Sequence, residues 1–550
     1  MPTTLTSMEY NFDLGIEDQG SFVDRSRAFN VGDLLRKAAR TNSDRVAVSE
    51  PSVTRTYAEL DDRVNRLSNA LLERGYRPNE TTIGIISENR SEVVEVMYAG
   101  AKLGCLVPAL NWRLEREELL HCIDLVEPDV LFVSERFADR RSWVEDGAES
   151  DPEFVFFDGT DDAGYESVLE ERDASEPLPD QRIDPEQGLV VLYTSGTTGL
   201  PKGVVISHRT WIARAFKTIT DFGLEKGDSQ LAWPPMFHIV SADWIPTVTI
   251  LGGTYYPVDG FDNEAVVDVL RENGSPIGWL VLLPGVIQRF LEYMDENDVS
   301  VDEFRECRNV GALVDLIDPK KVERVTERFD QPYKNSYGAT ENGNVLSGGN
   351  DIPIGVRPTD DELAKEESAY TDCKLIDEDW NEVGVGEKGE LATRGPSLCS
   401  GYIENPEANE DEFDDGWFRT GDIFIKNEDG TYSFVNRRKY LIKSGGENIY
   451  PAEIETTLLT HEKIDDAVVV RVPDEKWGEV PRAVVGTEDP SAVSEDELMT
   501  LLRDEIASYK LPHYVDIVRP EDFPRSTTGK IVREEIEDWD VSSEERVREV

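Results

Sequence analysis

Strand-like and helix-like segments alternate at short spacing early in the chain, and this alternation most constrains the fold. Thr56 and Glu59 form a capping-box pattern at the start of the segment 56–75, in which leucine and valine recur at helical spacing. The apolar run TTIGIIS (81–87) and the helical run SEVVEVMYAGAKLG (91–104) follow, and then come CLVPAL, EREELLHCIDLVE and DVLFVS. Strand, helix and strand at this spacing predict a parallel sheet with crossover helices.

The later part of the chain repeats this alternation and then changes character. The segments GVVISHRTWIARAFKTI (203–219) and GWLVLLPGVIQRFLEYM (278–294) each indicate a strand followed by a helix. Between about 135 and 186, an acidic stretch with glycine and proline predicts surface loops with a few strands. Short strands and turns prevail from about 370 to 424.

These patterns predict an α/β protein of more than one domain. A chain of 550 residues is too long for one compact core. We expect a large N-terminal domain of parallel α/β sheets over residues 1–436, with a β-rich subdomain at about 350–436. A small mobile C-terminal α+β domain is expected over 437–550, joined by a hinge near 436–441.

Composition indicates a globular protein of a reducing compartment. Hydrophobic residues make up 39% of the chain, and no apolar run approaches the ~18 residues that a membrane span needs. Residues 1–20 lack the basic and apolar regions of a secretory signal peptide. The five cysteines are scattered without metal or disulfide spacing, so we expect a cytoplasmic protein without a membrane span.

The formal net charge of −55 is extreme for a chain with this much hydrophobic content. It disfavours a nucleic-acid partner, because binding phosphates requires a cationic surface. At about 1 M salt the Debye length falls to about 3 Å, so a dense acidic surface repels itself little and stays hydrated. The charge therefore favours a halophilic, haloarchaeal-like source. The oligomeric state stays open.

The segment YTSGTTGLPKG (193–203) crowds hydroxyl side chains and glycines onto one loop that ends in a lysine. A kinase-type phosphate loop places its lysine directly after the second glycine, and the spacing here differs. Glycines still let backbone N–H groups converge on an anion, and apolar strand-like runs on both sides argue against a flexible linker. The predicted phosphate-binding residues are Thr194, Ser195, Gly196, Thr197, Thr198, Gly199 and Lys202.

Further motifs follow this loop along the chain. They are PPMFHIVS with His238, NSYGATENG at 335–343, WFRTGD ending in Asp422, NRRKYLIKSGGENIYPAEIE at 436–455, and PRSTTGKIVR with Lys530. Together with the loop, this ordered set resembles the adenylate-forming (AMP-binding) superfamily, in its acyl-CoA synthetase branch, over about residues 57–533. The resemblance implies ATP and CoA as co-substrates and Mg²⁺ as the metal.

The resemblance also implies roles for residues of the large domain. His238 would lie beside the carboxylate substrate, and Thr340 would contact the α-phosphate. Glu341, with the hydroxyl of Thr194, would hold Mg²⁺, and oxygen ligands suit a hard dication that bridges phosphate oxygens. The remaining implied nucleotide or acyl contacts are Gly338, Gly311, Ala312, Tyr337 stacked on adenine, and Asp422, which accepts the ribose hydroxyls.

The C-terminal motifs match the family's mobile domain. The resemblance implies that Lys530 is the adenylation lysine and that Lys439 is the hinge position. Gly445 and Gly446 would line the pantetheine tunnel of a CoA ligase, where only a bare backbone leaves room. The remaining cations implied at this segment are Arg437, which reaches ribose and phosphate, and Lys443. The chain departs from the family pattern at Leu313, where proline is common, and at Tyr440, where Asp or Glu is common.

The resemblance implies an ATP-dependent acyl-CoA synthetase, which converts a carboxylic acid, ATP and CoA to acyl-CoA, AMP and pyrophosphate through an acyl-adenylate. Mostly apolar segments around His238 favour a fatty or other apolar acid. Asp243 and Asp315 leave an amino acid open, because either could anchor an ammonium group. Two other interpretations also remain open: transfer of the acyl group to a carrier-protein thiol, and a catalytically silent acyl- or adenylate-binding protein.

Overall fold

The computed structural model describes most of the chain. The described residues are 28–159, 164–179, 182–194, 200–272, 274–313, 318–349, 351–444, 447–474, 476–525 and 530–540. Within these ranges, every helix is too short or too polar to cross a bilayer.

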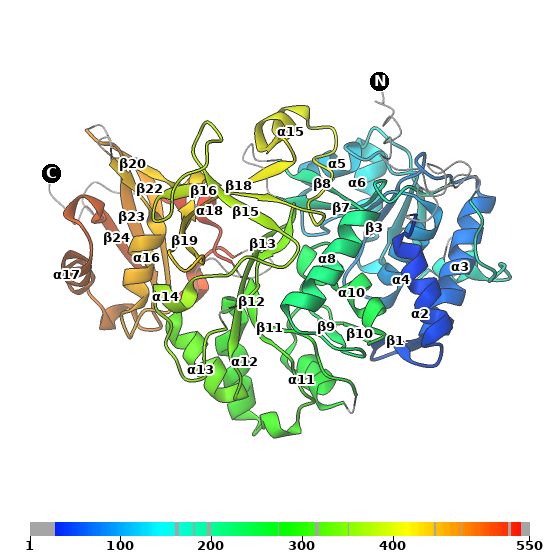
Figure 1. The fold of residues 1–550 in the computed structure, drawn as a ribbon, viewed down its shortest axis with the longest axis horizontal. Helices are drawn as coiled ribbons and strands as arrows, with labels where there is room; N and C mark the ends of the chain where they lie inside the picture. The colour runs from blue at the N-terminus through cyan, green and yellow to red at the C-terminus, as the bar shows by residue number, and fades with distance from the viewer. Residues whose placement is uncertain are drawn as a thin grey trace, which may run out of the picture.

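Two sheets with parallel strands form the first part of the large domain (Figure 1). In the sheet β2-β1-β10-β9, strands β1, β10 and β9 run parallel, and β2 pairs with β1 in the antiparallel sense. The sheet β3-β5-β6 is parallel throughout. The strands are β1 (Val46–Glu50), β2 (Val53–Thr56), β3 (Ile83–Ile86), β5 (Val130–Val133), β6 (Glu153–Phe156), β9 (Gln230–Ala232) and β10 (Tyr255–Pro257).

Helices follow the strands of these sheets along the chain, as the sequence predicts. The capping box of α3 is confirmed, because the Thr56 side chain accepts from the Glu59 N–H and Glu59 accepts from the Thr56 N–H. Leu60 and Val64 of this helix are fully buried, and α3 packs on α2 and α4 while α10 packs on α8. The helices are α2 (Val31–Thr41), α3 (Tyr57–Glu73), α4 (Ser91–Leu103), α5 (Arg116–Asp124), α8 (His208–Asp221), α9 (Ile239–Ala242) and α10 (Trp244–Leu251).

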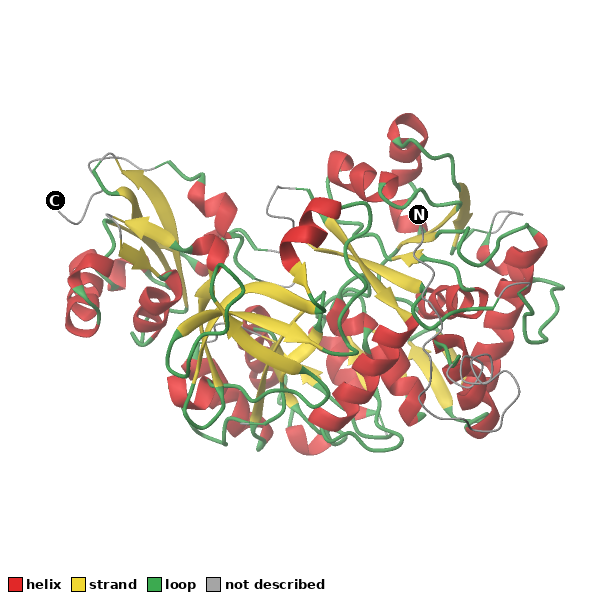
Figure 2. Ribbon diagram, turned by 45° about the horizontal axis from the view of Figure 1, so that its top comes forward, coloured by secondary structure: helices red, strands yellow, loops and turns green. Residues whose placement is uncertain are grey.

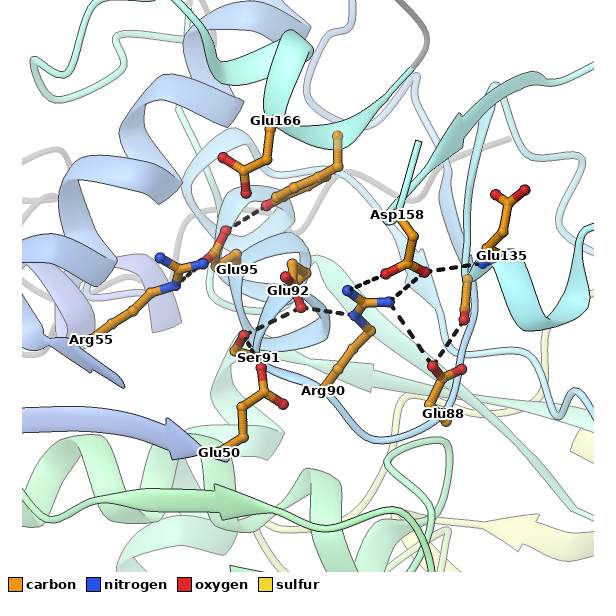
Figure 3. Close-up of polar contacts among 12 residues, drawn as sticks. Glu50, Arg55, Glu88, Arg90, Ser91, Glu92, Glu95, Glu135, Asp158 and Glu166 are labelled. Atoms are coloured by element: carbon orange, nitrogen blue, oxygen red, sulfur yellow. Dashed lines mark hydrogen bonds and ion pairs between the residues drawn. The ribbon is translucent and has the colours of Figure 1, made fainter. Parts of the chain in front are cut away.

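A network of ion pairs fills the carboxyl edge of the sheet β3-β5-β6 (Figure 3). Arg90, at the N-terminus of α4, contacts Asp158 at 2.9 Å and Glu92 at 2.8 Å. Deeper in the protein, the fully buried carboxylate of Glu95 lies 2.9 Å from Nε of Arg55. Buried charges are tolerated when they are paired in this way. The edge at which many α/β sheets bind ligands is therefore occupied here by protein side chains.

The stretch 135–186 is more helical than its composition predicts. The prediction of loops with a few strands was wrong in part, because α6 (Arg140–Gly147) and α7 (Tyr165–Leu169) lie in it. Val144 of α6 and Tyr165 of α7 are buried, so these short helices are held by packing rather than by local sequence preference.

Two further sheets bring the motifs together. In β4-β7-β8, β7 and β8 form an antiparallel hairpin, and in β11-β12-β13-β14 the first three strands are parallel. The strands are β4 (Val107–Pro108), β7 (Gly188–Thr194), β8 (Lys202–Ser207), β11 (Leu280–Val281), β12 (Val310–Leu313), β13 (Tyr333–Ala339) and β14 (Gly343–Leu346). The flanking helices are α11 (Asn263–Arg271), α12 (Pro284–Glu296) and α13 (Pro319–Phe329).

An antiparallel sheet, β15-β16-β18-β17 with β19 on β18, follows the parallel sheets. Its strands are β15 (Asp372–Ile376), β16 (Lys388–Arg394), β17 (Phe413–Asp414), β18 (Trp417–Lys426) and β19 (Tyr432–Arg437). The short helices here are α14 (Asp360–Leu363) and α15 (Pro406–Glu412), which ends just before β17.

A separate sheet, β21-β20-β23-β22 with β24 on β23, forms the C-terminal part (Figure 2). Figure 1 shows this part at the end of the molecule opposite α2 and α3, with α16 against β19. Its strands are β20 (Ile442–Ser444), β21 (Glu447–Ile449), β22 (Asp466–Asp474), β23 (Gly478–Gly486) and β24 (Tyr514–Val518). Its helices are α16 (Pro451–Leu459), α17 (Glu495–Glu505) and α18 (Arg533–Glu537).

Two lysines at the start of α13 tie the large domain to the C-terminal part. Nζ of Lys320 donates to the backbone carbonyls of His461, at 3.0 Å, and Ile464, at 2.7 Å. Nζ of Lys321 donates to the carbonyl of Asp465 at 3.2 Å. These contacts join α13 to the loop between α16 and β22.

Candidate active site

The candidate site is a cavity of about 460 Å³ between the large domain and the C-terminal part. Its walls come from the β7–β8 hairpin, the N-terminus of α9, the end of β13 with the turn that follows, and strands β18 and β19. The residues predicted from the sequence that line it are Thr194, Lys202, His238, Gly338, Thr340, Glu341, Asp422, Arg437, Lys439 and Lys530. The structure thus brings together side chains that are far apart along the chain.

Other predicted residues lie elsewhere. Ser195, Gly196, Thr197, Thr198, Gly199, Gly445 and Gly446 fall outside the described residues. Among the described residues, Gly311 and Ala312 are buried in β12 and Lys443 is exposed on β20, and none of the three lines the cavity. Ligand contacts at these positions stay predictions.

The β7–β8 hairpin positions the predicted phosphate lysine. Thr194 is the partner of Lys202 in the antiparallel ladder, so these two residues lie side by side where β7 ends and β8 begins. Nζ of Lys202 lies 2.6 Å from a carboxylate oxygen of Glu412 and 4.2 Å from the ring centre of Tyr402. The lysine therefore points into the cavity from a rigid base and already has an anionic partner there.

Glu341 lies in the turn between β13 and β14. Its carboxylate lies 2.9 Å from the hydroxyl oxygen of Tyr402, and burial raises the pKa of this carboxyl group. Asn342 steadies the turn, because its side chain accepts from the N–H of Ala339 at 2.9 Å.

The oxygens of Glu341 and Thr194 suit a magnesium ion that is shared with a nucleotide. The described residues contain no group of three or more His, Cys, Asp or Glu side chains that could hold a metal ion by themselves. Mg²⁺ is usually held by one or two carboxylates plus substrate phosphates and water, so a full protein cage is not required. Glu341 provides the buried carboxylate, and Thr194 lines the same cavity.

Tyr337 and Asp422 are joined directly. The Tyr337 hydroxyl donates to Oδ2 of Asp422 at 2.5 Å, and Nε of Arg437, the partner of Asp422 across β18 and β19, lies 3.3 Å from Oδ1. Tyr337 is itself buried, with its ring edge-on to Phe424 at 5.0 Å between centres. A carboxylate has about four lone-pair sites, so Asp422 keeps capacity for ribose hydroxyls. Stacking of Tyr337 on adenine stays a prediction.

His238 and Lys530 face the same region of the cavity. Nδ1 of His238 accepts the backbone N–H of Val240 at 3.3 Å, at the start of α9. Burial first, and then the positive charge of Lys530, lower the pKa of His238 to about 4. The ring is therefore neutral near pH 7 and carries its proton on Nε2, as a donor.

The segment after β19 connects to the stretch that carries Lys530. Nζ of Lys439 lies 3.0 Å from the carboxylate of Glu534 on α18, and the hydroxyl of Tyr440 donates to the same oxygen at 3.2 Å. Glu534 thus holds the end of the Lys530 segment against the predicted hinge. Tyr440, where the chain departs from the family pattern, takes part in this contact.

Sequence reasoning missed two buried cations of α8. Arg214 donates from Nη2 to the carbonyls of Thr340 and Glu341, both at 2.9 Å, and from Nε to the carbonyl of Ser397 at 2.9 Å. Lys217 donates to the Ser397 hydroxyl at 2.8 Å, and burial lowers its pKa to about 7. The sequence signal that could have indicated them is the presence of two cations three positions apart on a helix that packs into the core.

The fold and the cavity define the class of the protein. A large α/β domain with mixed sheets, a smaller C-terminal domain, and a lysine from that domain at the cavity form the adenylate-forming enzyme fold. The chain matches the family "AMP-binding enzyme" over residues 35–403 and "AMP-binding enzyme C-terminal domain" over residues 453–530. The chain belongs to the AMP-binding enzyme family.

Relatives extend along almost the whole chain. Indoleacetate–CoA ligase of Aromatoleum aromaticum is 30% identical over 515 residues, which are 92% of this chain and 97% of that protein. The fatty acid–[acyl-carrier-protein] ligase ScoC of Streptomyces coeruleorubidus is 30% identical over 493 residues, 88% of this chain and 91% of that protein. Relatives of this kind are AMP-forming acid–thiol ligases, and this chain is an enzyme of that class.

A solved structure supports the same class. The o-succinylbenzoate CoA synthetase of Bacillus subtilis, in complex with its acyl-adenylate intermediate, superposes with a TM-score of 0.76 at 25% identity. The superposition covers 92% of this chain and 98% of that one.

Proposed function

We propose that this enzyme is an ATP-dependent acyl-CoA synthetase that acts on a fatty or other apolar carboxylic acid. It joins the acid to ATP as an acyl-adenylate, with loss of pyrophosphate, and then transfers the acyl group to CoA with release of AMP. One observation carries the proposal: Lys530 and His238 face one cavity together with Glu341 and Asp422. A protein that only binds an adenylate has no need of a lysine at this point.

The first half-reaction brings two anions together. The carboxylate oxygen attacks the α-phosphorus, the bond to the β-phosphate oxygen breaks, and pyrophosphate leaves. Holding both reactants in line can lower the barrier by roughly 7–11 kcal/mol. Lys530 would neutralise the charge on the acyl and phosphate oxygens, and Nε2–H of His238 would orient the carboxylate. Mg²⁺, when bound beside Glu341 and Thr194, supplies electrostatic stabilisation of the phosphate charge.

The second half-reaction requires space at the same carbonyl carbon. The CoA thiolate adds there and AMP leaves with the electron pair of the acyl–phosphate bond. A lysine that already occupies this approach must withdraw, which supports the proposal of a mobile domain, 437–550, that turns about a hinge near Lys439. In that turned state Gly445 and Gly446 would face the pantetheine.

The acyl group would lie against the apolar part of the cavity. Phe237, Ile239, Val240 and Leu283 line this part. Asp243, a possible anchor for an amino acid, lies with its carboxylate 3.7 Å from Nη1 of Arg214. An anionic side chain that already faces a buried guanidinium is a poor partner for a substrate ammonium, which favours an apolar acid.

The relatives leave one alternative acceptor. Because ScoC is named as a ligase to an acyl-carrier protein, transfer to a carrier-protein thiol is the second candidate. The adenylation chemistry is the same in both cases. Dependence on free CoA separates the two.

We also propose that this protein is a cytoplasmic enzyme of a halophile. The net charge of −55 is favourable for solubility in concentrated salt and unfavourable for compactness in dilute salt. Thermal unfolding recorded between low and molar KCl tests this proposal, with a transition temperature that rises with KCl as the expected outcome.

The test of function is carboxylate-dependent exchange of pyrophosphate into ATP, measured in molar KCl with fatty, aromatic and amino acids. AMP release is then measured with and without CoA. Exchange with an apolar acid and CoA-dependent AMP release support the ligase. Exchange without CoA dependence supports the carrier-protein alternative, and ATP binding without any exchange supports a silent binder.

A further inference from the structure

The cavity holds a second carboxylate on the side of the phosphate lysine. Glu412 is the last residue of α15, and its carboxylate lies among Lys202, Tyr402 and Glu341. One of its oxygens is 2.6 Å from Nζ of Lys202, and the other accepts from the Tyr402 hydroxyl at 2.5 Å. Both oxygens are therefore engaged, and the side chain is held in one position.

The contact is partly shielded from water. The side chain of Lys202 is 12% exposed and that of Glu412 is 24% exposed. The ammonium also lies 4.2 Å from the centre of the Tyr402 ring, which adds a cation–π attraction. A pair with this geometry and partial burial interacts more strongly than a freely exposed surface pair.

The hydroxyl of Tyr402 has a single proton for two carboxylates. It approaches Glu412 at 2.5 Å and Glu341 at 2.9 Å. A short hydrogen bond to an ionised acceptor is the stronger kind, so the distances assign the proton to the contact with Glu412. Tyr402 thus fixes Glu412 as the counter-ion of Lys202 and keeps the two carboxylates apart.

We propose that Glu412 is a positioning residue that holds Lys202 until a polyphosphate displaces it, and so sets the affinity of the site for pyrophosphate and for the phosphates of ATP. Incoming phosphate oxygens compete with Glu412 for the same ammonium. When pyrophosphate leaves, Lys202 returns to Glu412. The carboxylate weakens binding of the leaving product and favours its release.

This inference rests on the proposed function, because it assigns Lys202 to the phosphates. The effect of Glu412 on Lys202 differs from the general effect of removing a negative charge. In a chain with a net charge of −55, removal of any acidic group favours an anion slightly. Glu407, on the same helix α15, is exposed, so Glu407→Gln makes the same change of charge away from Lys202.

The experiment is calorimetric titration with inorganic pyrophosphate in EDTA, at the lowest KCl concentration at which the full chain stays folded by circular dichroism. Glu412→Gln is expected to lower the Kd by about five- to tenfold, because Lys202 no longer has to leave a carboxylate. Glu407→Gln should leave the Kd unchanged. In a Lys202→Met background, Glu412→Gln should no longer lower the Kd.

Steady-state kinetics provide a second readout. In the CoA-dependent reaction, the inhibition constant of pyrophosphate should fall in Glu412→Gln by the same factor as the Kd. A lost structural contact would instead weaken pyrophosphate binding. If Glu412→Gln does not fold, Glu412→Asp keeps the charge, withdraws it by one methylene, and should give a smaller decrease in the same direction.

The outcomes separate the inference from the proposed function. An unchanged or higher Kd in Glu412→Gln, an equal gain in Glu407→Gln, or a gain that persists with Lys202→Met overturns the inference. If the wild-type protein binds neither pyrophosphate nor magnesium ATP, the assignment of the site fails, and the inference fails with it.

Discussion

The hydroxyl of Tyr337 donates a 2.5 Å hydrogen bond to Oδ2 of Asp422 and so joins β13 of the mixed sheet β11-β12-β13-β14 to β18 of the antiparallel sheet. Arg437 approaches the other carboxylate oxygen at 3.3 Å. The orientation of the proposed ribose acceptor is therefore set by residues of two sheets.

Replacement of Tyr337 by Phe tests this orientation separately from adenine stacking. The ring is retained and the hydrogen bond is lost, so we expect the KM for ATP to rise about fivefold at a similar kcat, in line with about 1 kcal/mol for one hydrogen bond. Tyr370→Phe, at a side chain that is 64% exposed, is the matched control. Wild-type kinetics in Tyr337→Phe would show that the hydroxyl does not orient Asp422.

Removal of Lys530 tests the assignment of the adenylation lysine. In Lys530→Ala, exchange of pyrophosphate into ATP is expected to fall by about 10²–10³-fold, because the charge that develops at the α-phosphate loses its counter-ion. Calorimetric titration should show a much smaller change in the Kd of ATP. Lys226→Ala, at an exposed lysine of the large domain, should keep wild-type exchange.

Arg214 is expected to position the turn that carries Thr340 and Glu341. In Arg214→Leu, the backbone carbonyls of both residues lose their partner in a buried setting, which we expect to lower the free energy of unfolding by about 3 kcal/mol. The KM for ATP should rise about tenfold, with partial recovery in Arg214→Lys. A stability loss without any change in KM would reduce Arg214 to a purely structural residue.

His208 predicts a pH dependence of stability. This residue is fully buried, its Nδ1 accepts the N–H of Val31 at 3.2 Å, and burial lowers its pKa to about 3. Below pH 6.5 the unfolded chain binds a proton at His208 that the folded chain does not. The contribution of the neutral imidazole to the free energy of unfolding is therefore complete above pH 6.5 and is lost as the pH falls toward 3.

Urea unfolding at pH 7 and at pH 5 measures this contribution. The loss expected from His208 is up to about 1.4 kcal/mol per pH unit. In His208→Gln, the side-chain carbonyl can still accept from Val31. The free energy of unfolding of this variant should therefore decline less between pH 7 and pH 5 than that of the wild type. An identical decline in both proteins would show that His208 does not titrate in this way.

Much of the site could be predicted because its chemistry is carried by contiguous motifs. Thr340 and Glu341 lie in NSYGATENG, and Lys530 lies in PRSTTGKIVR, so each is recognisable from its immediate neighbours. The helix 57–73 was likewise predictable, since its capping box and its apolar face are local patterns.

The rest depends on contacts between distant segments. Arg214 meets carbonyls that are more than a hundred residues away in sequence, and Glu412 of α15 meets Lys202 of β8, 210 residues away. The spacing of Arg214 and Lys217 indicates two cations on one helix, but no sequence pattern identifies the distant partners in either contact. The helices α6 and α7 were missed for a related reason, because they are stabilised by packing of a few buried side chains rather than by helix propensity.

The lysines at the start of α13 donate hydrogen bonds to backbone carbonyls of the C-terminal part, those of His461, Ile464 and Asp465. Each is a hydrogen bond from a charged group and contributes about 1.5–3 kcal/mol, and a carbonyl returned to water is hydrated again. In the proposed turn of the C-terminal part, these hydrogen bonds would break and could form again without any chemical change at the contact. After such a turn the C-terminal part would return to the same position, because the two lysines have three defined carbonyl partners on the loop between α16 and β22.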